Sequence, residues 1–329
     1  MEKHNRLIAG IMALMLVFGT GTAVVHTKFS IPDSVIATSA ETLQYGSLSY
    51  EVLDNDNITI TGFDDSVTEV EIPSEIDGKP VTAIGANAFL SKKIKSVTIP
   101  DSITSIGYQA FKTCKNLTSV SIPDSVVEIG SNAFSSCTAL QSVKLSSNVS
   151  AIGQHNFSDC IALMEITIPN GVTSIGNSAF NGCISLKSIT LPDTLTIIDV
   201  FAFRDCNSLE SVTIPASVAT IGKESFYNCR SLKEITIMHP NCNITNGAIT
   251  NEYSSYSGVI YGEEGSTAQA YAESKGFTFQ TVGSKLKKGD INGDGMINAV
   301  DATWILRYYS HLSTGGTMSL DEFIANESE

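Results

Sequence analysis

Oxygen-bearing side chains near the C-terminal end of the chain have the spacing of a calcium-binding loop. Ca²⁺ takes about six to eight oxygen ligands, and a twelve-residue loop supplies them from positions 1, 3, 5, 7, 9 and 12. Here Asp or Asn occupies every one of these positions except position 7, which can use its backbone carbonyl. We therefore predict a Ca²⁺ site with the ligands Asp290, Asn292, Asp294, Met296, Asn298 and Asp301.

Two alternatives to a Ca²⁺ site exist at this loop. Mg²⁺ fits less well, because it prefers fewer protein ligands in a regular octahedron. A turn rich in Asp and Asn that binds no metal is the other alternative. Gly295 permits the sharp turn that a metal loop needs, and Ile297 would tie the loop to a following helix. Calcium is therefore the cofactor that the sequence predicts.

The element that positions the rest of the chain is a repeat of 23 residues. Its clearest mark is a row of cysteines: Cys114, Cys137, Cys160, Cys183, Cys206 and Cys229. Self-similarity at such a period is typical of a solenoid, in which each copy buries its apolar face against its neighbours. We place the six regular copies at residues 94–231.

Each copy carries the same sequence of structural signals. It opens with a short alternating stretch that predicts a strand, and a proline usually ends that strand. A second extended piece follows with an inward isoleucine, then a glycine that we expect to supply a tight turn. A phenylalanine then predicts a continuous aromatic spine: Phe111, Phe134, Phe157, Phe180, Phe203 and Phe226. One copy departs, because it has KLSSNV where others have I-P-D-S-V, and we expect it to turn on Ser and Asn side chains.

The cysteines have two interpretations. An exported protein often oxidises its thiols. Equivalent residues one coil apart would lie roughly 4.8 Å from each other, but parallel side chains suit a disulfide poorly. We expect free thiols that fill the core as small hydrophobic groups. A bridge from Cys229 to Cys242 is the alternative that fits least badly.

With its motif L-x-x-[VI]-x-I-P-x-x-[VI]-x-x-I-G-x-x-[AS]-F-x-x-C, the repeat resembles the BspA-type leucine-rich repeat of bacterial surface proteins. The resemblance covers roughly residues 68–240. It implies a β-rich repeat solenoid that is curved, with a parallel sheet on one face and short strands or turns on the other. It also implies ligand recognition rather than catalysis.

The calcium loop and the helix after it resemble a type I dockerin, the module that binds cohesins on cellulosome scaffolds. An Asp at position 12 and the lack of a clear entering helix carry this resemblance. It implies a small α-helical, calcium-binding tail and a scaffoldin cohesin as partner. The residues that would face the cohesin are Ala299, Val300, Leu306, Arg307 and His311. Only one of the two segments of a complete dockerin is recognisable, so the module is partial.

The N-terminal residues have the pattern of a secretory signal. A basic start precedes an apolar run from Leu7 to Val25, and small residues lie before both Val24 and Glu41. We favour cleavage before Glu41, where patterned sequence begins. An uncleaved membrane anchor is the alternative, because the run is long enough to span a bilayer.

The remaining segments are expected to close the ends of the solenoid. Alternating residues around Asp54–Asn57 predict a hairpin in an N-terminal cap, and VIYGEEGSTAQAYAESKGFTF predicts strand, helix and strand in a C-terminal cap. In that cap we expect Tyr261, Tyr271 and Phe277 to pack rather than bind a ligand. The predicted organisation is a signal peptide at 1–40, an N-terminal cap with an irregular repeat at 41–93, six repeats at 94–231, a C-terminal cap at 232–283, a linker at 284–289 and a partial dockerin at 290–329.

Composition argues against several classes of function. A formal net charge of −14 without a basic cluster leaves nucleic-acid binding without its electrostatic basis. No arrangement of catalytic residues stands out, and Asp101, Asp124 and Asp193 recur at the turn after the strand, which favours a turn role over glycosidase chemistry. We therefore predict a protein that is not an enzyme.

The sequence thus predicts a secreted, extracellular recognition or adhesion protein. Its repeats would bind a protein or a plant cell-wall polysaccharide, and its tail would attach it to a cohesin in a cellulosome. Two alternatives are an independent cell-surface adhesin with a vestigial calcium loop and the N-terminal part of a longer cellulosomal, polysaccharide-degrading enzyme. A membrane contact is expected only if the signal segment is uncleaved.

Overall fold

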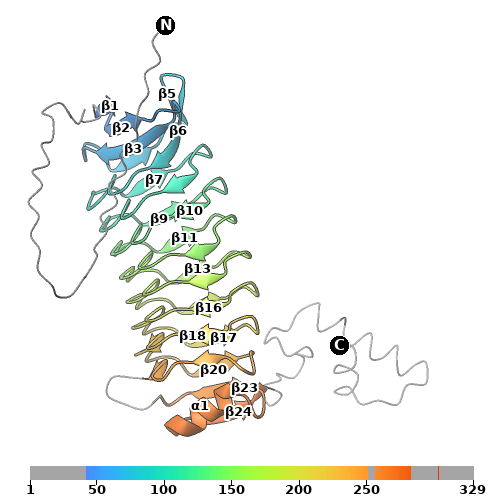
Figure 1. The fold of residues 1–329 in the computed structure, drawn as a ribbon. Coiled ribbons are helices and arrows are strands. Elements are labelled where there is room, and N and C mark those ends of the chain that lie inside the picture. The colour runs from blue at the N-terminus through green and yellow to red at the C-terminus, as the bar shows by residue number, and fades with distance from the viewer. Residues whose placement is uncertain (1–41, 251–255, 283–302, 304–329) are drawn as a thin grey trace, which may run out of the picture. The chain divides into compact units, whose positions relative to one another are not determined.

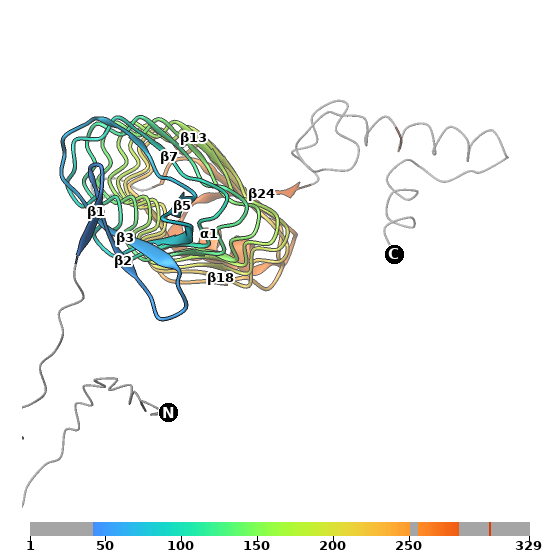
Figure 2. The same cartoon turned by 90° about the horizontal axis from the view of Figure 1, so that it is seen from above.

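Each 23-residue copy folds into one coil, and successive coils stack into a column (Figure 1). The structure is a computed structural model that describes residues 42–250, residues 256–282 and Thr303. Viewed along the column, equivalent parts of successive coils lie over one another (Figure 2). The predicted β-rich repeat solenoid is therefore confirmed for the described coils.

The first strand of each coil lies on one side of the column. Its central residue is buried and its two neighbours are exposed in the regular coils, as expected for a strand with one face on the core. Paired strands are parallel and are shifted by one repeat, so that Ser119 aligns with Ser142 and Ser211 with Glu234. The strands on this side are β4 (Glu69–Glu71), β7 (Ser96–Thr98), β9 (Ser119–Ser121), β11 (Ser142–Lys144), β13 (Glu165–Thr167), β15 (Ser188–Thr190), β17 (Ser211–Ile214) and β20 (Glu234–Ile237).

A second set of parallel strands forms another side of the column. The isoleucine that ends each of these strands points inward, and all but two are fully buried, the exceptions being Ile129 and Ile244. The inward row of isoleucines that the sequence predicts for the regular repeats is therefore confirmed. The strands are β6 (Lys79–Ile84), β8 (Ser105–Ile106), β10 (Glu128–Ile129), β12 (Ala151–Ile152), β14 (Ser174–Ile175), β16 (Ile197–Ile198), β18 (Thr220–Ile221) and β21 (Asn243–Ile244).

The predicted hairpin closes the N-terminal end of the coils. Strands β2 (Leu48–Val52) and β3 (Ile58–Phe63) are antiparallel, and β3 then pairs in parallel with β6. The edge strand β1 (Leu43–Tyr45) pairs with β2, and β5 (Glu75–Ile76) pairs with β6. The hairpin thus covers apolar side chains that the first coil would otherwise expose.

The C-terminal end follows the predicted order of strand, helix and strand. Strand β23 (Val259–Gly262) pairs with β20, helix α1 (Thr267–Lys275) follows, and β24 (Thr278–Thr281) pairs with β23. Ser266 is the N-cap of the helix and Gly276 its left-handed C-cap, as these residue types favour. Two further short strands, β19 (Phe226–Tyr227) and β22 (Ile249–Thr250), pair in parallel nearby.

The aromatic residues of this end pack as expected. Tyr271 is buried and donates its hydroxyl hydrogen to the carbonyl oxygen of Ile249 at 3.2 Å. The rings of Tyr256 and Phe277 meet edge to face with centroids 5.4 Å apart. Tyr261 is only 8% exposed. The prediction that these side chains pack within the cap is therefore confirmed.

A column of stacked phenylalanine rings runs through the coils. From Phe89 to Phe226, neighbouring ring centroids are 4.9 to 5.7 Å apart with interplanar angles between 3° and 14°. Phe63 of strand β3 extends the column at a tilted angle. Every ring between these ends is fully buried, so the predicted spine is confirmed and begins earlier than the six regular copies.

The turn that carries each phenylalanine contains two residues in the left-handed region. In the coil of Phe111 these are Gln109 and Thr113, with φ of 55° and 62°. Their amides, and that of Phe111 itself, donate to carbonyl oxygens of the next coil at 2.7 to 3.0 Å. Non-glycine residues adopt this conformation at a cost, which the bonds between coils offset.

The glycine after the second strand begins a tight turn, as predicted, because its carbonyl accepts from the amide three residues further on, but its conformation is not the reason that glycine is needed. The positive-φ glycines are others, so Gly107 and Gly130 do not supply a left-handed turn. A Cβ atom on Gly107 would lie 2.6 Å from the amide nitrogen of Ala86, and one on Gly130 would lie 2.5 Å from that of Tyr108. Glycine is therefore required because the preceding coil passes too close for a side chain.

Candidate functional site

The outward side chains of the first strands form a surface composed mainly of hydroxyl groups. We call it the hydroxyl face, and it comprises the two outward positions of the first strands β7, β9, β11, β13, β15 and β17. Ten of its twelve residues are Ser or Thr, and none is aromatic or a large aliphatic residue. Its members are Ser96, Thr98, Ser119, Ser121, Ser142, Lys144, Glu165, Thr167, Ser188, Thr190, Ser211 and Thr213.

This surface follows from the repeat itself. Alternation along a strand places every second side chain outside, and stacking places equivalent side chains of successive coils in rows. Within the paired strands β13 and β15 the rows are in register, with Glu165 beside Ser188 and Thr167 beside Thr190. The sequence analysis predicts these strands but not this surface. The S-x-T and S-x-S pattern at the outward positions is the signal that could have predicted it.

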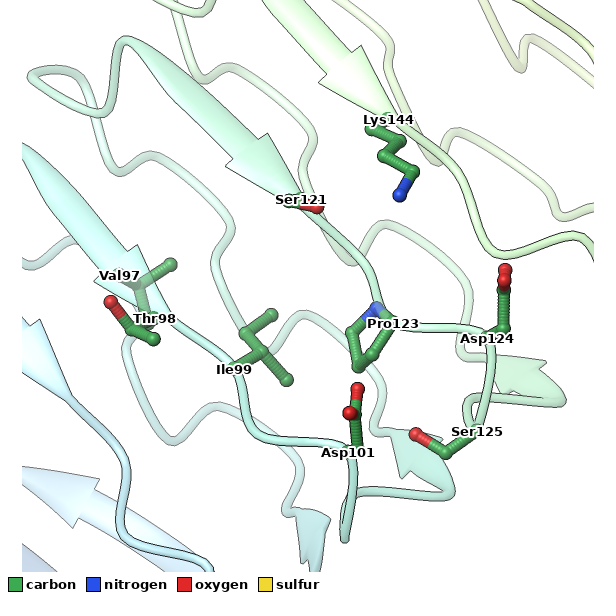
Figure 3. A pocket seen from close by; sticks show the side chains of 9 residues that line it. All are labelled: Val97, Thr98, Ile99, Asp101, Ser121, Pro123, Asp124, Ser125 and Lys144. Atoms are coloured by element: carbon green, nitrogen blue, oxygen red, sulfur yellow. The ribbon is translucent and has the colours of Figure 1, made fainter.

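An open pocket of 540 Å³ lies where strands β7, β9 and β11 end and the chain turns the corner (Figure 3). Its apolar part comes from Val97 and Ile99, each 8% exposed, and from the ring of Pro123. Its polar part comes from hydroxyl-face residues and from the turns, namely Thr98, Ser121, Lys144, Asp101, Asp124 and Ser125. The pocket is therefore amphipathic and continuous with the hydroxyl face.

The three charged groups of the pocket have different environments. The amide and hydroxyl of Ser147 hold the pKa of Asp124 below its usual value, with a smaller contribution from the Lys144 ammonium. The backbone amide of Ser147 donates a hydrogen bond to Oδ1 of Asp124, with a nitrogen–oxygen distance of 2.8 Å. Within the described residues, the side chains of Asp101 and Lys144 form no hydrogen bond or ion pair. Figure 3 shows Lys144 turned from its strand toward the pocket. Two of the three charges are thus available to a ligand.

The irregular KLSSNV coil forms one wall of this region. Ser146 is fully buried, donates to the carbonyl of Val126 at 2.6 Å and accepts from the amide of Asn148 at 3.1 Å. The side-chain amide of Asn148 donates to the carbonyl of Asp124 at 2.7 Å. The predicted turn built on Ser and Asn chemistry is confirmed, and the same coil contributes Lys144.

The aspartates after the strands lie in turns, as predicted, because the amide three residues after each proline donates to the carbonyl of that proline, but their side chains do not share one hydrogen bond. Asp124 bonds to the next coil rather than within its own turn. For Asp101 and Asp193 no side-chain hydrogen bond is formed with any described residue. The recurrence of Asp at this position is thus not explained by a shared turn bond, and Asp101 is left facing the pocket.

The cysteines are free and buried, as predicted, and the alternative bridge between Cys229 and Cys242 is not formed. Each thiol of the regular row donates to the carbonyl of the phenylalanine in the preceding coil, at 3.0 to 3.2 Å. Burial raises the pKa of the Cys114 and Cys229 thiols to about 12 and that of Cys242 to about 11. These groups therefore belong to the core and not to a reactive site.

A second polar cluster lies on the aromatic turns and satisfies its own charges. The Arg204 guanidinium lies 4.7 Å from the ring centroid of Tyr227 and 5.3 Å from that of Phe201. It also pairs with Glu224 at 2.8 Å and with Asp205 at 3.3 Å. Its contacts are those of a structural cation–π and ion-pair network.

The predicted calcium and cohesin-binding residues lie outside the described part of the chain. These are Asp290, Asn292, Asp294, Met296, Asn298 and Asp301 for the metal and Ala299, Val300, Leu306, Arg307 and His311 for the partner. The described residues contain no group of three or more His, Cys, Asp or Glu side chains placed to hold a metal ion. They also include no helix long and apolar enough to cross a membrane, and the Leu7–Val25 run lies outside them.

A family model for the BspA-type leucine-rich repeat region matches six copies in this chain, over residues 82–179 and 151–272. Together the two ranges span more than half of the 329 residues. No curated protein matches the chain.

Solved structures with similar folds are also leucine-rich repeat proteins. One from T. pallidum is 26% identical with a TM-score of 0.50, and the alignment covers 73% of this chain and 98% of that one. A leucine rich cell surface protein from Faecalibacterium prausnitzii is 25% identical with a TM-score of 0.49, and the alignment covers 65% of this chain and 76% of that one. A leucine-rich repeat protein from Bacteroides ovatus is 22% identical with a TM-score of 0.45, and the alignment covers 67% of this chain and 70% of that one.

Proposed function

This chain belongs to the BspA-type leucine-rich repeat family, and from that premise we propose that it is a noncatalytic recognition or adhesion protein of the cell surface or the extracellular space. The hydroxyl face is the surface through which it binds its ligand. The observation that carries this proposal is the pair of exposed side chains that recurs once per coil on the first strands β7, β9, β11, β13, β15 and β17, in register within the pairs β9–β11 and β13–β15. A rigid column that repeats one surface is suited to an extended ligand.

Two features support binding rather than catalysis. The hydroxyl face offers hydrogen-bond donors and acceptors, but its one Lys and one Glu lie on different strands, β11 and β13. The buried thiols have raised pKa values, which leaves them protonated and unreactive near neutral pH. Export is supported by the N-terminal pattern of basic start, apolar run and small residues.

The tail extends this proposal to assembly. We propose that residues 290–329 bind Ca²⁺ through Asp290, Asn292 and Asp294 with the other predicted ligands, and that the loaded segment binds a scaffoldin cohesin. The support is the ligand spacing and the resemblance to a type I dockerin. A lone loop and helix have a small core, so metal binding would supply part of its folding free energy.

Recognition through the hydroxyl face is tested by blocking it. The double variant Ser188→Arg/Thr190→Arg places two long cations on β15, and the matched variant Val127→Arg/Ser150→Arg places them at exposed positions beside β10 and β12. Full-length chains are applied to arrays of glycans and of cell-surface proteins. We expect the first variant to lose the captured ligands and the second to keep them. Equal capture by both variants would show that the hydroxyl face is not the binding surface.

Calcium and cohesin binding are tested separately. Trp304 is the only tryptophan of the chain and lies in the predicted tail, so its fluorescence reports on that segment. We expect saturable Ca²⁺ binding that Asp290→Ala and Asp294→Ala abolish, together with Ca²⁺-dependent capture by a cohesin panel. Calcium binding without cohesin capture would favour the independent adhesin, and an absence of both would remove the tail from the proposal.

A further inference from the structure

The pocket at the ends of β7, β9 and β11 has the composition of a binding site for a hydroxyl-rich molecule. It combines a small apolar surface of Val97, Ile99 and Pro123 with hydroxyl, carboxylate and ammonium groups around it. Most ligand pockets likewise combine apolar lining with a few polar groups that fix orientation. A sugar unit presents the matching surfaces, because its C–H face is apolar and its edge carries hydroxyl groups.

The charges of the pocket favour an uncharged ligand. The carboxylates of Asp101 and Asp124 would repel a polyanion, and the Lys144 ammonium would repel a basic peptide. A neutral sugar can instead donate hydroxyl hydrogens to the free carboxylate oxygens and accept a hydrogen from Lys144. Hydrogen bonds to charged groups are the stronger ones, so these three side chains would contribute most of the specificity.

The surface beyond the pocket disfavours a protein partner. Energetically dominant residues in protein interfaces are enriched in Trp, Tyr and Arg, with Ser and Thr under-represented. The hydroxyl face contains ten Ser or Thr residues and none of the enriched types. Its rows repeat once per coil along the column, so they offer the same groups at each step to a ligand that itself repeats.

We infer that this pocket is a saccharide subsite, in which one unit of a neutral, linear polysaccharide is held by Asp101, Asp124 and Lys144 while the neighbouring units lie on the hydroxyl face. This inference rests on the proposed recognition function and specifies its ligand class. Asp124 is held in place by the hydrogen bond from the Ser147 amide to its Oδ1, so its carboxylate is preorganised to accept from the ligand. The Asp101 side chain forms no hydrogen bond or ion pair with any described residue, so both of its carboxylate oxygens are available to the ligand.

The test compares two equivalent aspartates. Asp101→Ala removes a pocket carboxylate, whereas Asp193→Ala removes the aspartate at the same repeat position four coils away, which does not line the pocket. The full-length chain and both variants are titrated by calorimetry with linear hexasaccharides of β-1,4-glucose, β-1,4-xylose, β-1,4-mannose and α-1,4-glucose. We expect at least one to bind, with affinity lowered about tenfold or more by Asp101→Ala and unchanged by Asp193→Ala.

Other outcomes separate this inference from the proposed function. If no hexasaccharide binds, or if both variants bind one equally well, the saccharide subsite is wrong. If the chain captures only proteins on the arrays and the β15 variant abolishes that capture, recognition through the hydroxyl face stands and the ligand class is overturned. Circular dichroism spectra and urea midpoints that match the unmodified chain ensure that a loss of binding is not a loss of folding.

Discussion

At the scale of single residues, identity is dictated by what lies directly behind each side chain. Cys114 is fully buried and gives its thiol hydrogen to the carbonyl of Phe89, which a small, weakly polar group can do without disturbing the packing. Gly130 faces the backbone of the preceding coil at a distance that excludes a Cβ atom. Both residues are thus specified by the neighbouring coil and not by their own.

The buried thiols predict a loss of stability in alkali. The pKa of Cys114 is raised from 9.0 to about 12, so the unfolded chain releases a proton that the folded chain retains. The stabilising contribution is fully present below pH 9.0 and is lost as the pH rises toward about 12. In urea unfolding from pH 8 to pH 12, Cys114→Ala should reduce the slope of stability against pH above pH 9 by about 1 kcal/mol per unit.

A second thiol provides the control for this pH dependence. The pKa of Cys242 is raised only to about 11, so its contribution should stop changing at a lower pH than that of Cys114. Identical slopes in the unmodified chain and in Cys114→Ala would contradict the assigned cause.

The close contact at Gly130 predicts a steric penalty. A Cβ atom there would lie 2.5 Å from the amide nitrogen of Tyr108, and backbone atoms cannot move aside as a flexible side chain can. Gly130→Ala should lower the free energy of unfolding by about 1–3 kcal/mol. The matched variant Gly62→Ala meets only the Ser49 side chain at 3.3 Å and should change it less. Urea denaturation of the full chain measures both, and an equal effect would refute the interpretation.

At the scale of elements, the turns decide what the strands can display. Proline ends the first strand in most coils because it cannot donate to the ladder, and the KLSSNV coil replaces it with side-chain hydrogen bonds from Ser146 and Asn148. The KLSSNV coil also contributes Lys144, and the coil before it contributes Asp124, so both side chains line the pocket. The irregular turn is therefore part of the candidate site.

Loss of the Ser146 hydroxyl should destabilise this coil. Ser146→Ala removes two hydrogen bonds in a fully buried setting and leaves the Val126 carbonyl without its donor. We expect the free energy of unfolding to fall by about 1–3 kcal/mol. Ser150→Ala, at an exposed position of the same coil whose hydroxyl forms no hydrogen bond with any described residue, keeps the carbonyl that accepts from Thr173 and should be nearly neutral. Chemical denaturation distinguishes them, and similar values for the two variants would argue against the turn's contribution.

At the scale of the whole molecule, stability is shared between neighbours along the column. Each coil contacts mainly the coils beside it, so the structure behaves as a chain of nearest-neighbour interfaces. The phenylalanine spine is the most continuous of these interfaces, with centroid spacings of 5.7 and 5.6 Å on either side of Phe157. A defect at the centre should therefore separate the column into two parts.

Phe157→Ala tests this cooperativity. Removing a fully buried ring should cost about 3–5 kcal/mol. It should also broaden the urea transition, because the two halves of the column can then unfold separately. Phe277→Ala, at the partly buried terminal cap, should lower stability less and keep the transition sharp. A sharp single transition in Phe157→Ala would show that the coils remain coupled without the spine.

The sequence by itself determined the repeat, its strands, the aromatic spine, the buried thiols and both caps. It could do so because burial and strand alternation act on each residue type in the same way in every copy. Local turn signals likewise predicted a helix between two strands in the C-terminal cap, and the structure places it between Ser266 and Gly276.

Only the tertiary structure decided the features that depend on contacts between coils. The left-handed positions beside each phenylalanine hold residues as different as Gln109, His155 and Phe201, so no residue type marks them, and bonds to the next coil impose their conformation. The pocket likewise joins Asp101, Asp124 and Lys144 from three coils that the sequence separates by whole repeats. Stacking brings such residues together, and stacking is a property of the folded column.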